Sequence, residues 1–100
     1  MSKYHVFVEP SAWKEIKRLP GNMRQRLKRA VDDLSLEPRP ARTKLLETDP
    51  PTLELRRLRL ANWRVIYAVN EELKQVQVLA IRQRPPYDYD DLAQLLDQLD

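Results

Sequence analysis

The chain has no cysteine, one histidine and one glycine, and each scarcity excludes a class of chemistry. Without cysteine there can be no disulfide and no thiolate metal site. A lone His5 does not make a metal cluster, and no Ser-His-Asp triad can be placed because Ser11 and Ser35 lie at predicted helix ends. The single Gly21 excludes a glycine-rich phosphate loop. No run of about 18 apolar residues could span a membrane, and the amino terminus has no signal-peptide core, so we expect a cytoplasmic protein without cofactor or metal.

Arginine is what the chain has in excess. All 12 Arg and six Lys lie at or before Arg84 with ten of the 15 acids, which gives this part a net charge of +8. The last sixteen residues hold five Asp and no base. Because a guanidinium binds phosphate oxygens bidentately, a basic body rich in arginine favours a nucleic-acid partner. The acidic end is a segment that could shield such a surface.

The apolar pattern predicts one α+β domain over residues 1–100, in which an N-terminal strand and two helices pack on a mainly antiparallel four-stranded sheet. Residues 4–9 form the first predicted strand, in which His5 is a structural residue. Ser11 is expected to cap a first helix with Trp13 and Ile16 on its apolar side.

A second helix is predicted from apolar residues at spacings of four, four and three, which place Met23, Leu27, Val31 and Leu34 on one stripe. The prolines of residues 37–40 end it. Residues 38–52 are expected to be a long connection.

The two helices carry seven bases against a single acid before Asp32. Solvated helix faces usually mix both signs, so this bias favours a surface that docks on a phosphate backbone, with an ordinary solvated face as the alternative. With residues from the connection and the hairpin, the predicted RNA-binding set is Lys14, Lys17, Arg18, Arg24, Arg26, Lys28, Arg29, Arg42, Lys44 and Arg59.

Residues 54–69 predict a β-hairpin around which the chain is organised. Leu58 and Leu60 alternate with Arg57 and Arg59, which is the period of a half-buried strand. Ala61-Asn62 forms the turn, and Trp63 to Val69 is rich in β-branched and aromatic residues. Four arginines within nine residues suit a polyanion, although a solvated sheet face would look similar. Trp63 and Tyr67 are expected in the core rather than stacked on an RNA base.

Lys74 to Ile81 predicts the last strand, followed by Arg82, Arg84 and Tyr87. With no metal ligands or triad, the chemistry left is attack of a ribose 2′-hydroxyl on the adjacent phosphate. Arginines can stabilise the charge on that phosphate but cannot readily act as a base. Tyr87 is the nearby group that can exchange a proton, because neighbouring cations favour its phenolate.

Residues 88–100 predict an amphipathic helix with Leu92, Leu95, Leu96 and Leu99 on one side. The cluster Asp88, Asp90 and Asp91 is better explained as the start of this helix, where the helix dipole favours acids, than as a metal site.

The order of these elements, and the run Leu55 to Tyr67, resemble the RelE/ParE toxin superfamily. The run is similar to the family's hairpin R-x-R-x-G-[DN]-[YW]-R-V-[IV]-Y. Residues 80–87 resemble its ending I-x-x-R-x-x-x-Y, and residues 34–38 fit its helix ending L-x-x-x-P.

This resemblance implies a toxin of a type II toxin–antitoxin pair, with a cognate antitoxin as partner. RelE-like members cut messenger RNA in the ribosomal A site. This reaction implies that Arg64 stabilises the pentavalent phosphate, with Arg57 and Arg84 or Arg82 helping. Tyr87 would act on the 2′-hydroxyl. ParE-like members instead poison DNA gyrase, and a decayed toxin that only binds antitoxin is a third alternative.

Three positions depart from the family pattern. Ala61 stands where glycine is common, and Leu55 stands where some members carry a lysine that is a candidate base. The spacing to Tyr87 also fits either Arg82 or Arg84. The last two departures bear on proton transfer, whereas the phosphate clamp is intact.

Overall fold

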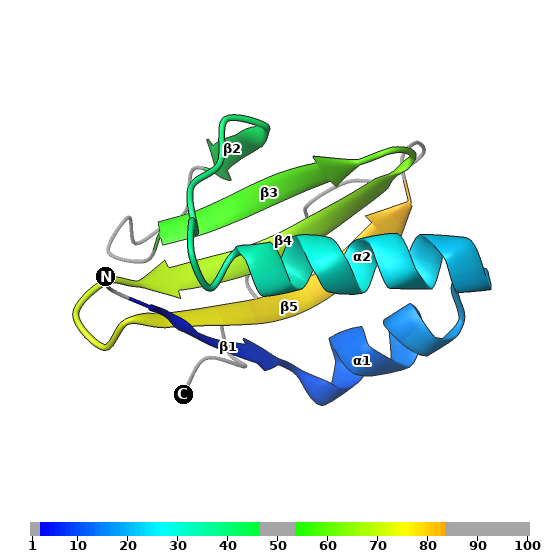
Figure 1. The fold of residues 1–100 in the computed structure, drawn as a ribbon, viewed down its shortest axis with the longest axis horizontal. Helices are drawn as coiled ribbons and strands as arrows, with labels where there is room; N and C mark the ends of the chain where they lie inside the picture. Colours follow the sequence, from blue (N-terminus) through cyan, green and yellow to red (C-terminus); the bar gives the residue numbers. More distant parts are fainter. Residues whose placement is uncertain (1–2, 47–53, 84–100) are drawn as a thin grey trace.

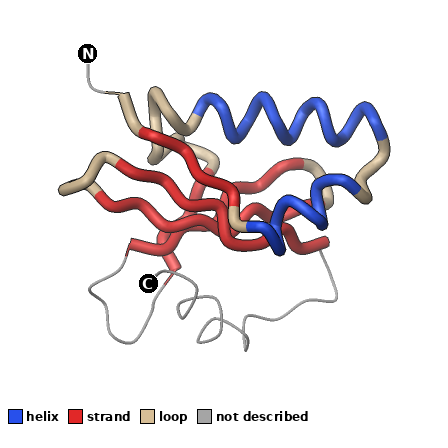
Figure 2. Tube along the Cα trace, turned by 90° about the horizontal axis from the view of Figure 1, so that it is seen from below, coloured by secondary structure: helices blue, strands red, loops and turns tan. Residues whose placement is uncertain are grey.

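A computed structural model describes residues 3–46 and 54–83 as two helices that cover one face of a sheet (Figure 1). The elements are β1 His5–Val8, α1 Pro10–Lys17, α2 Gly21–Asp33, β2 Thr43–Leu46, β3 Glu54–Leu60, β4 Trp63–Asn70 and β5 Gln75–Gln83. In a view turned by 90°, α2 lies along one side of the sheet, separate from the strands (Figure 2). The predicted α+β order of one strand, two helices and a sheet is confirmed, whereas the predicted helix of residues 88–100 lies outside the described residues. None of the described helices is long and apolar enough to cross a membrane.

The sheet has five strands in the order β1-β5-β4-β3-β2, so the prediction of four strands was wrong. β1 runs parallel to β5, and the other neighbours are antiparallel. The missed strand, β2, lies within the predicted connection 38–52. It was missed because it is a short edge strand in which Lys44 and Leu45 are both exposed, so it has no two-residue period.

Both helices begin after a proline or at one. Pro10 ends β1 as predicted, but it is also the first residue of α1, where its missing N–H costs nothing. Glu9 is the N-cap residue, so Ser11 lies inside the helix and the predicted Ser11 cap was wrong. Similarly, Pro20 precedes α2, which starts at Gly21.

The main core fills the space between the helices and the sheet. The predicted stripe of α2 is confirmed, since Leu27, Val31 and Leu34 are buried against the sheet and Met23 packs beside them. On α1 the buried positions are Ala12 and Ile16.

Among the aromatic residues, Tyr67 and Trp63 lie in the core as predicted, whereas Trp13 does so only in part. Trp13 is 38% exposed, so its predicted place on the apolar side of α1 was only partly right. Tyr67 is fully buried and Trp63 packs against the same cluster, which confirms both as core residues.

A second apolar cluster involves Leu55, Ile66, Ala68, Leu79 and Ala80 from β3, β4 and β5. Ile66 pairs with Ala80 but Tyr67 pairs with Val78, so Leu79 is an extra residue in β5. This bulge changes the alternation of the strand. Ala80 therefore belongs to this second cluster, whereas Ile81 joins Val76 and Val78 in the main core.

The hairpin between β3 and β4 closes through two residues, because Leu60 pairs directly with Trp63. Ala61 in this turn has φ of 52°, which lies in the left-handed region. A Cβ atom makes this conformation unfavourable, whereas glycine adopts it freely. Ala61 is thus a strained residue at the position where the family motif has glycine.

We expect Ala61→Gly to raise the free energy of unfolding by about 1 kcal/mol, because it removes this strain. Urea unfolding followed by circular dichroism measures the change. Ala41→Gly is the control: Ala41 lies in the exposed connection without a positive φ, and glycine there should leave stability unchanged or lower it. Equal effects of the two substitutions would contradict the prediction.

Candidate nucleic-acid interface

Three arginines stand side by side on the three middle strands, at the end of the sheet where β3 and β4 form their hairpin. Arg59 of β3 pairs directly with Arg64 of β4, which pairs in turn with Arg82 of β5. Residues directly opposite one another on neighbouring strands share a face of the sheet. Like charges in such positions destabilise a sheet unless an acid neutralises them, and within the described ranges a carboxylate, that of Glu15, pairs with Arg82 alone of the three.

β2 extends this basic surface to a fourth strand. Arg57 lies two residues before Arg59 on the same face and pairs with Lys44. Leu58 and Leu60 belong to the helix-covered core, which confirms the predicted alternation. We name the set Lys44, Arg57, Arg59, Arg64 and Arg82 the arginine face. Lys44 was predicted as an RNA contact in a loop, and the structure places it in a strand opposite Arg57.

Arg64 is the most enclosed member of the arginine face, with only 4% of its surface exposed. Its Nη1 donates to the carbonyl oxygens of Ala61 at 3.1 Å and Trp63 at 2.9 Å. Its Nε is buried without an acceptor. Among residues 3–46 and 54–83, no carboxylate pairs with it. A buried charge without a counter-ion is costly, and an incoming phosphate would relieve that cost.

Arg82 is held by a helix. Its Nη1 lies 3.2 Å from Oε1 of Glu15 on α1, an ion pair between residues far apart in the sequence that no local pattern predicts. Arg84 and Tyr87 lie outside the described residues, so the choice between Arg82 and Arg84 stays a prediction, as does the role of Tyr87.

The predicted RNA-binding residues of the helices and the connection are all exposed. They do not form one patch with the arginine face, since they belong to the helix layer and its connection to β2. The exposed residues are Lys14, Lys17, Arg18, Arg24, Arg26, Lys28, Arg29 and Arg42.

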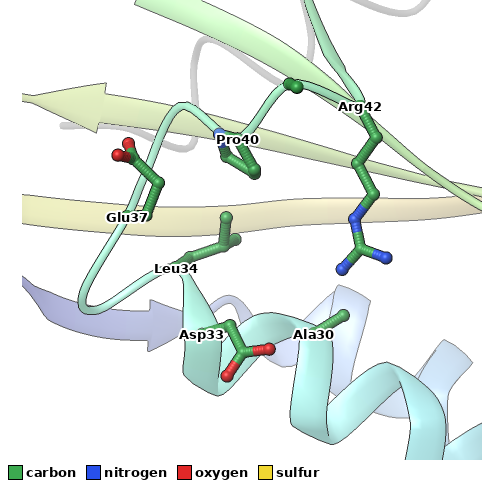
Figure 3. A pocket seen from close by; sticks show the side chains of 7 residues that line it. Ala30, Asp33, Leu34, Glu37, Pro40 and Arg42 are labelled. Atoms are coloured by element: carbon green, nitrogen blue, oxygen red, sulfur yellow. The ribbon is translucent and has the colours of Figure 1, made fainter.

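Two groupings within this set were not evident from the sequence. The amines of Lys17 and Lys28 lie 5.7 and 5.5 Å from the ring centre of Trp13. Three of the arginines line a pocket between α2 and the connection. Figure 3 shows the neighbouring pocket, which shares Arg42 with it. Helical spacing alone could not bring Arg42 to α2, because the two are joined by an irregular segment.

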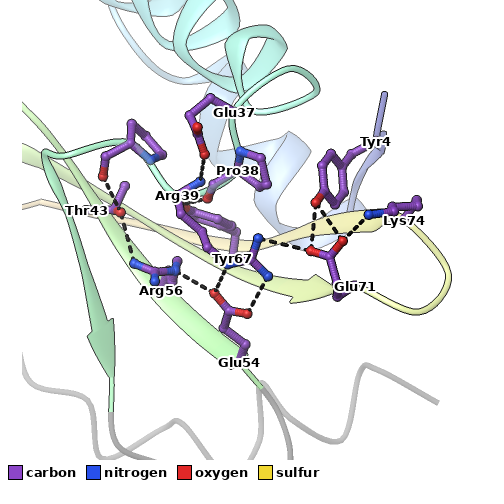
Figure 4. Close-up of polar contacts among 11 residues, drawn as sticks. Tyr4, Glu37, Pro38, Arg39, Thr43, Glu54, Arg56, Tyr67, Glu71 and Lys74 are labelled. Atoms are coloured by element: carbon purple, nitrogen blue, oxygen red, sulfur yellow. Dashed lines mark hydrogen bonds and ion pairs between the residues drawn. The ribbon is translucent and has the colours of Figure 1, made fainter. Parts of the chain in front are cut away.

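At the other end of β3, arginines are paired with acids (Figure 4). Nε and Nη2 of Arg39 each donate to Glu54 at 2.8 Å, and Nε of Arg56 donates to the same carboxylate at 2.7 Å. Hydrogen bonds from Arg39 and then Arg56 lower the pKa of Glu54, and the bond to Glu54 raises the pKa of Arg39. This network ties the connection to β3.

The same network extends to the turn between β4 and β5 and to the amino terminus. Glu71 accepts hydrogen bonds from Lys74 and from the Tyr4 hydroxyl, and it lies 3.0 Å from Arg39. These bonds, that of Lys74 first, lower the pKa of Glu71 to about 2. The Tyr67 hydroxyl donates to the Pro38 carbonyl at 2.6 Å, and burial raises the pKa of Tyr67 to about 12. These are structural contacts that hold the loops in place.

Metal ligation has no candidate site in the part of the chain that the structure describes, where no three His, Asp or Glu residues lie close enough to hold an ion.

The family model for the ParE toxin of the type II toxin–antitoxin system parDE matches residues 6–85. The chain belongs to the RelE/ParE toxin superfamily. This confirms the resemblance drawn from the hairpin and the strand that follows it. No protein of curated function matches the toxin in sequence.

Solved structures similar to the toxin include RelE proteins both alone and in complexes. The archaeal RelE–RelB complex from Pyrococcus horikoshii OT3 is 31% identical with a TM-score of 0.76, covering 87% of this chain and 100% of that one. The intact E. coli RelBE toxin-antitoxin complex is 26% identical with a TM-score of 0.64, covering 80% and 95%. RelBE2 from Mycobacterium tuberculosis shares the fold. It is 24% identical with a TM-score of 0.68, covering 82% of this chain and 99% of that one.

We expect acid to destabilise the toxin through Glu71 and Glu54. Because folding lowers their pKa values, the stability that their ionised forms contribute is present above the ordinary value of 4.5 and is lost as the pH falls through the folded values. Urea midpoints should therefore drop from pH 5 toward about pH 2, near the folded pKa of Glu71. Glu71→Gln should flatten that decline, while Glu72→Gln removes the same charge next to it and should not. An equal slope in both variants would contradict this role of Glu71.

Proposed function

We propose that the toxin is a ribosome-dependent, metal-independent endoribonuclease that cuts messenger RNA in the A site. The observation that carries the proposal is Arg64, a nearly buried guanidinium with no carboxylate partner in the described ranges, in a row with Arg59 and Arg82. Similarity to RelE proteins supports the same reaction class.

In the proposed reaction the 2′-oxygen of a ribose attacks the adjacent phosphorus while the bond to the 5′-oxygen of the next nucleotide breaks. The products are a 2′,3′-cyclic phosphate and a 5′-hydroxyl, so one proton leaves the 2′-oxygen and one reaches the 5′-oxygen. The phosphate gains negative charge in the transition state, where fixed guanidinium groups stabilise it most. Arg64 would do so, with Arg57 and Arg82 or Arg84 assisting.

Proton transfer is assigned to Tyr87. Arginine remains protonated at any relevant pH and does not serve as the base. Leu55, at the position where some relatives carry lysine, is fully buried. Tyr87 is therefore the group that we propose to act on the 2′-hydroxyl.

We expect Arg64→Ala to lower A-site cleavage by about 100-fold or more, because it removes the main charge-stabilising donor. Toeprinting on translating ribosomes without added metal measures the cleavage. Tyr87→Phe should lower the rate and alter its pH profile if the hydroxyl moves a proton. Lys3→Ala, which removes a charge away from the arginine face, serves as the control and should cleave as the wild type does.

The alternatives give different results in the same experiment. The match to a ParE family model favours a gyrase inhibitor as the second candidate. Growth arrest with intact messenger RNA, together with loss of gyrase supercoiling in vitro, would support that alternative. Intact messenger RNA without growth arrest would indicate a module that only binds its antitoxin.

We further propose that a cognate antitoxin blocks the arginine face. Structures of relatives are described as complexes with RelB, which supports an antitoxin partner for this chain. Residues 88–100, acidic and with regularly spaced leucines, would shield this face or be exchanged for an antitoxin helix of similar pattern.

Deletion of residues 91–100 tests this shielding. The truncated toxin should bind RNA more tightly, because acidic residues that compete with phosphate are gone, and its antitoxin affinity should change. Filter binding to labelled RNA and titration calorimetry with the antitoxin give the two values. Unchanged affinity for both partners would refute the proposal.

A further inference from the structure

A pocket of about 230 Å³ lies between α2 and the connection to β2, away from the arginine face. Its lining residues are Arg26, Arg29, Ala30, Asp33, Arg42 and Leu60. A neighbouring pocket of about 340 Å³ shares Ala30, Asp33 and Arg42 with it. Figure 3 shows the Arg42 side chain reaching from the connection toward α2, where Asp33 and Ala30 lie. We name the pocket of about 230 Å³, which Arg26, Arg29 and Arg42 line, the arginine pocket.

The three arginines come to this pocket from two separate segments. Arg26 and Arg29 are three residues apart, on one side of α2, and Arg42 approaches from the connection. Within the described ranges none of the three guanidinium groups makes a hydrogen bond or an ion pair with another residue. Asp33 is the one acid among the described lining residues, and it is not bonded to Arg42.

This arrangement differs from an ordinary helix–loop contact, which brings opposite charges together. The same chain contains such a contact of opposite charges elsewhere, since Arg39 and Arg56 both form ion pairs with Glu54. Three guanidiniums that converge without acceptors raise the local positive potential and leave their donors available for an anion.

We propose that the arginine pocket binds a phosphodiester of structured RNA as a second contact, separate from the arginine face. The proposal rests on the proposed function, in which the target is a ribosome-bound RNA. Guanidinium forks match the two non-bridging phosphate oxygens, while Ala30 and Leu60 offer an apolar wall for the ribose. All three arginines are exposed, so a strand can enter and leave the site.

The position of the pocket fits a role in docking rather than in chemistry. Leu60 is the last residue of β3, directly before the hairpin turn, and its side chain belongs to the helix-covered core. The pocket therefore lies on the helix side of the sheet, near the hairpin end that carries Arg59 and Arg64. RNA held there would orient the toxin without touching the scissile phosphate.

The experiment measures binding of the toxin to vacant 70S ribosomes by sedimentation, without any cleavage. Arg26→Gln/Arg29→Gln should weaken binding about tenfold or more and reduce the slope of log affinity against log salt by about one, because the pocket holds one phosphate. Circular dichroism verifies that the variant is folded.

Asp33 supplies the sharper comparison. Asp33→Asn removes the acid that competes with phosphate in the pocket, so it should tighten binding about two- to fivefold. Asp32→Asn changes the net charge equally on the neighbouring residue, but Asp32 lines a different pocket and should have a clearly smaller effect. Equal effects of the two substitutions would show general electrostatics alone and overturn the proposal.

The outcomes separate the two proposals. Wild-type toxin that binds ribosomes through the pocket but leaves messenger RNA intact would refute the nuclease function and support the pocket. Cleavage by the wild type together with unchanged ribosome affinity of Arg26→Gln/Arg29→Gln would support the nuclease function and refute the pocket. A double variant that loses affinity for the antitoxin instead of the ribosome would assign the pocket to a protein interface and overturn the proposal.

Discussion

The backbone register between β3, β4 and β5 decides both what is buried and what is charged in this toxin. Because side chains alternate between faces, one register places Leu58, Val65 and Ile81 in the helix-covered core and Arg59, Arg64 and Arg82 in a row on the opposite face. A slip by one residue would exchange the two sets and bury the charges. The apolar core thus fixes the position of the arginine face, although the two share no side chain.

The distribution of acids indicates which arginines serve the structure. At one end of β3, Arg39 and Arg56 are neutralised by Glu54, and these ion pairs join the connection to the sheet. At the other end Arg64 is more deeply buried, yet within the described residues no carboxylate pairs with it. The chain therefore has acids and places them beside some arginines only. Leaving a buried guanidinium without a counter-ion is destabilising, and such a cost is typical of a site that binds an anion.

The parts of this arrangement that depend on short-range patterns could be predicted from the sequence. The stripe of Leu27, Val31 and Leu34 and the alternation of Leu58 with Arg57 follow from helix and strand periods. β2 could not be found in this way, because an edge strand with exposed Lys44 and Leu45 gains its stability from backbone pairing rather than from an apolar face. The bulge at Leu79, the burial of Arg64 and the approach of Arg42 to α2 depend on tertiary packing, for which a local pattern carries no signal.

The two basic regions lie on different layers, and this separation bears on how one fold can act on different targets. The arginine face holds charge where a single phosphate would be stabilised, whereas the arginine pocket and the helix bases offer contacts that read only a phosphate backbone. Changes in the helix layer could redirect the toxin to another partner while the sheet, whose register is tied to the core, stays the same. In a superfamily that includes both RelE and ParE proteins, fold alone therefore does not determine the target, and the assignment depends on what the arginine face and its proton-transfer group can do.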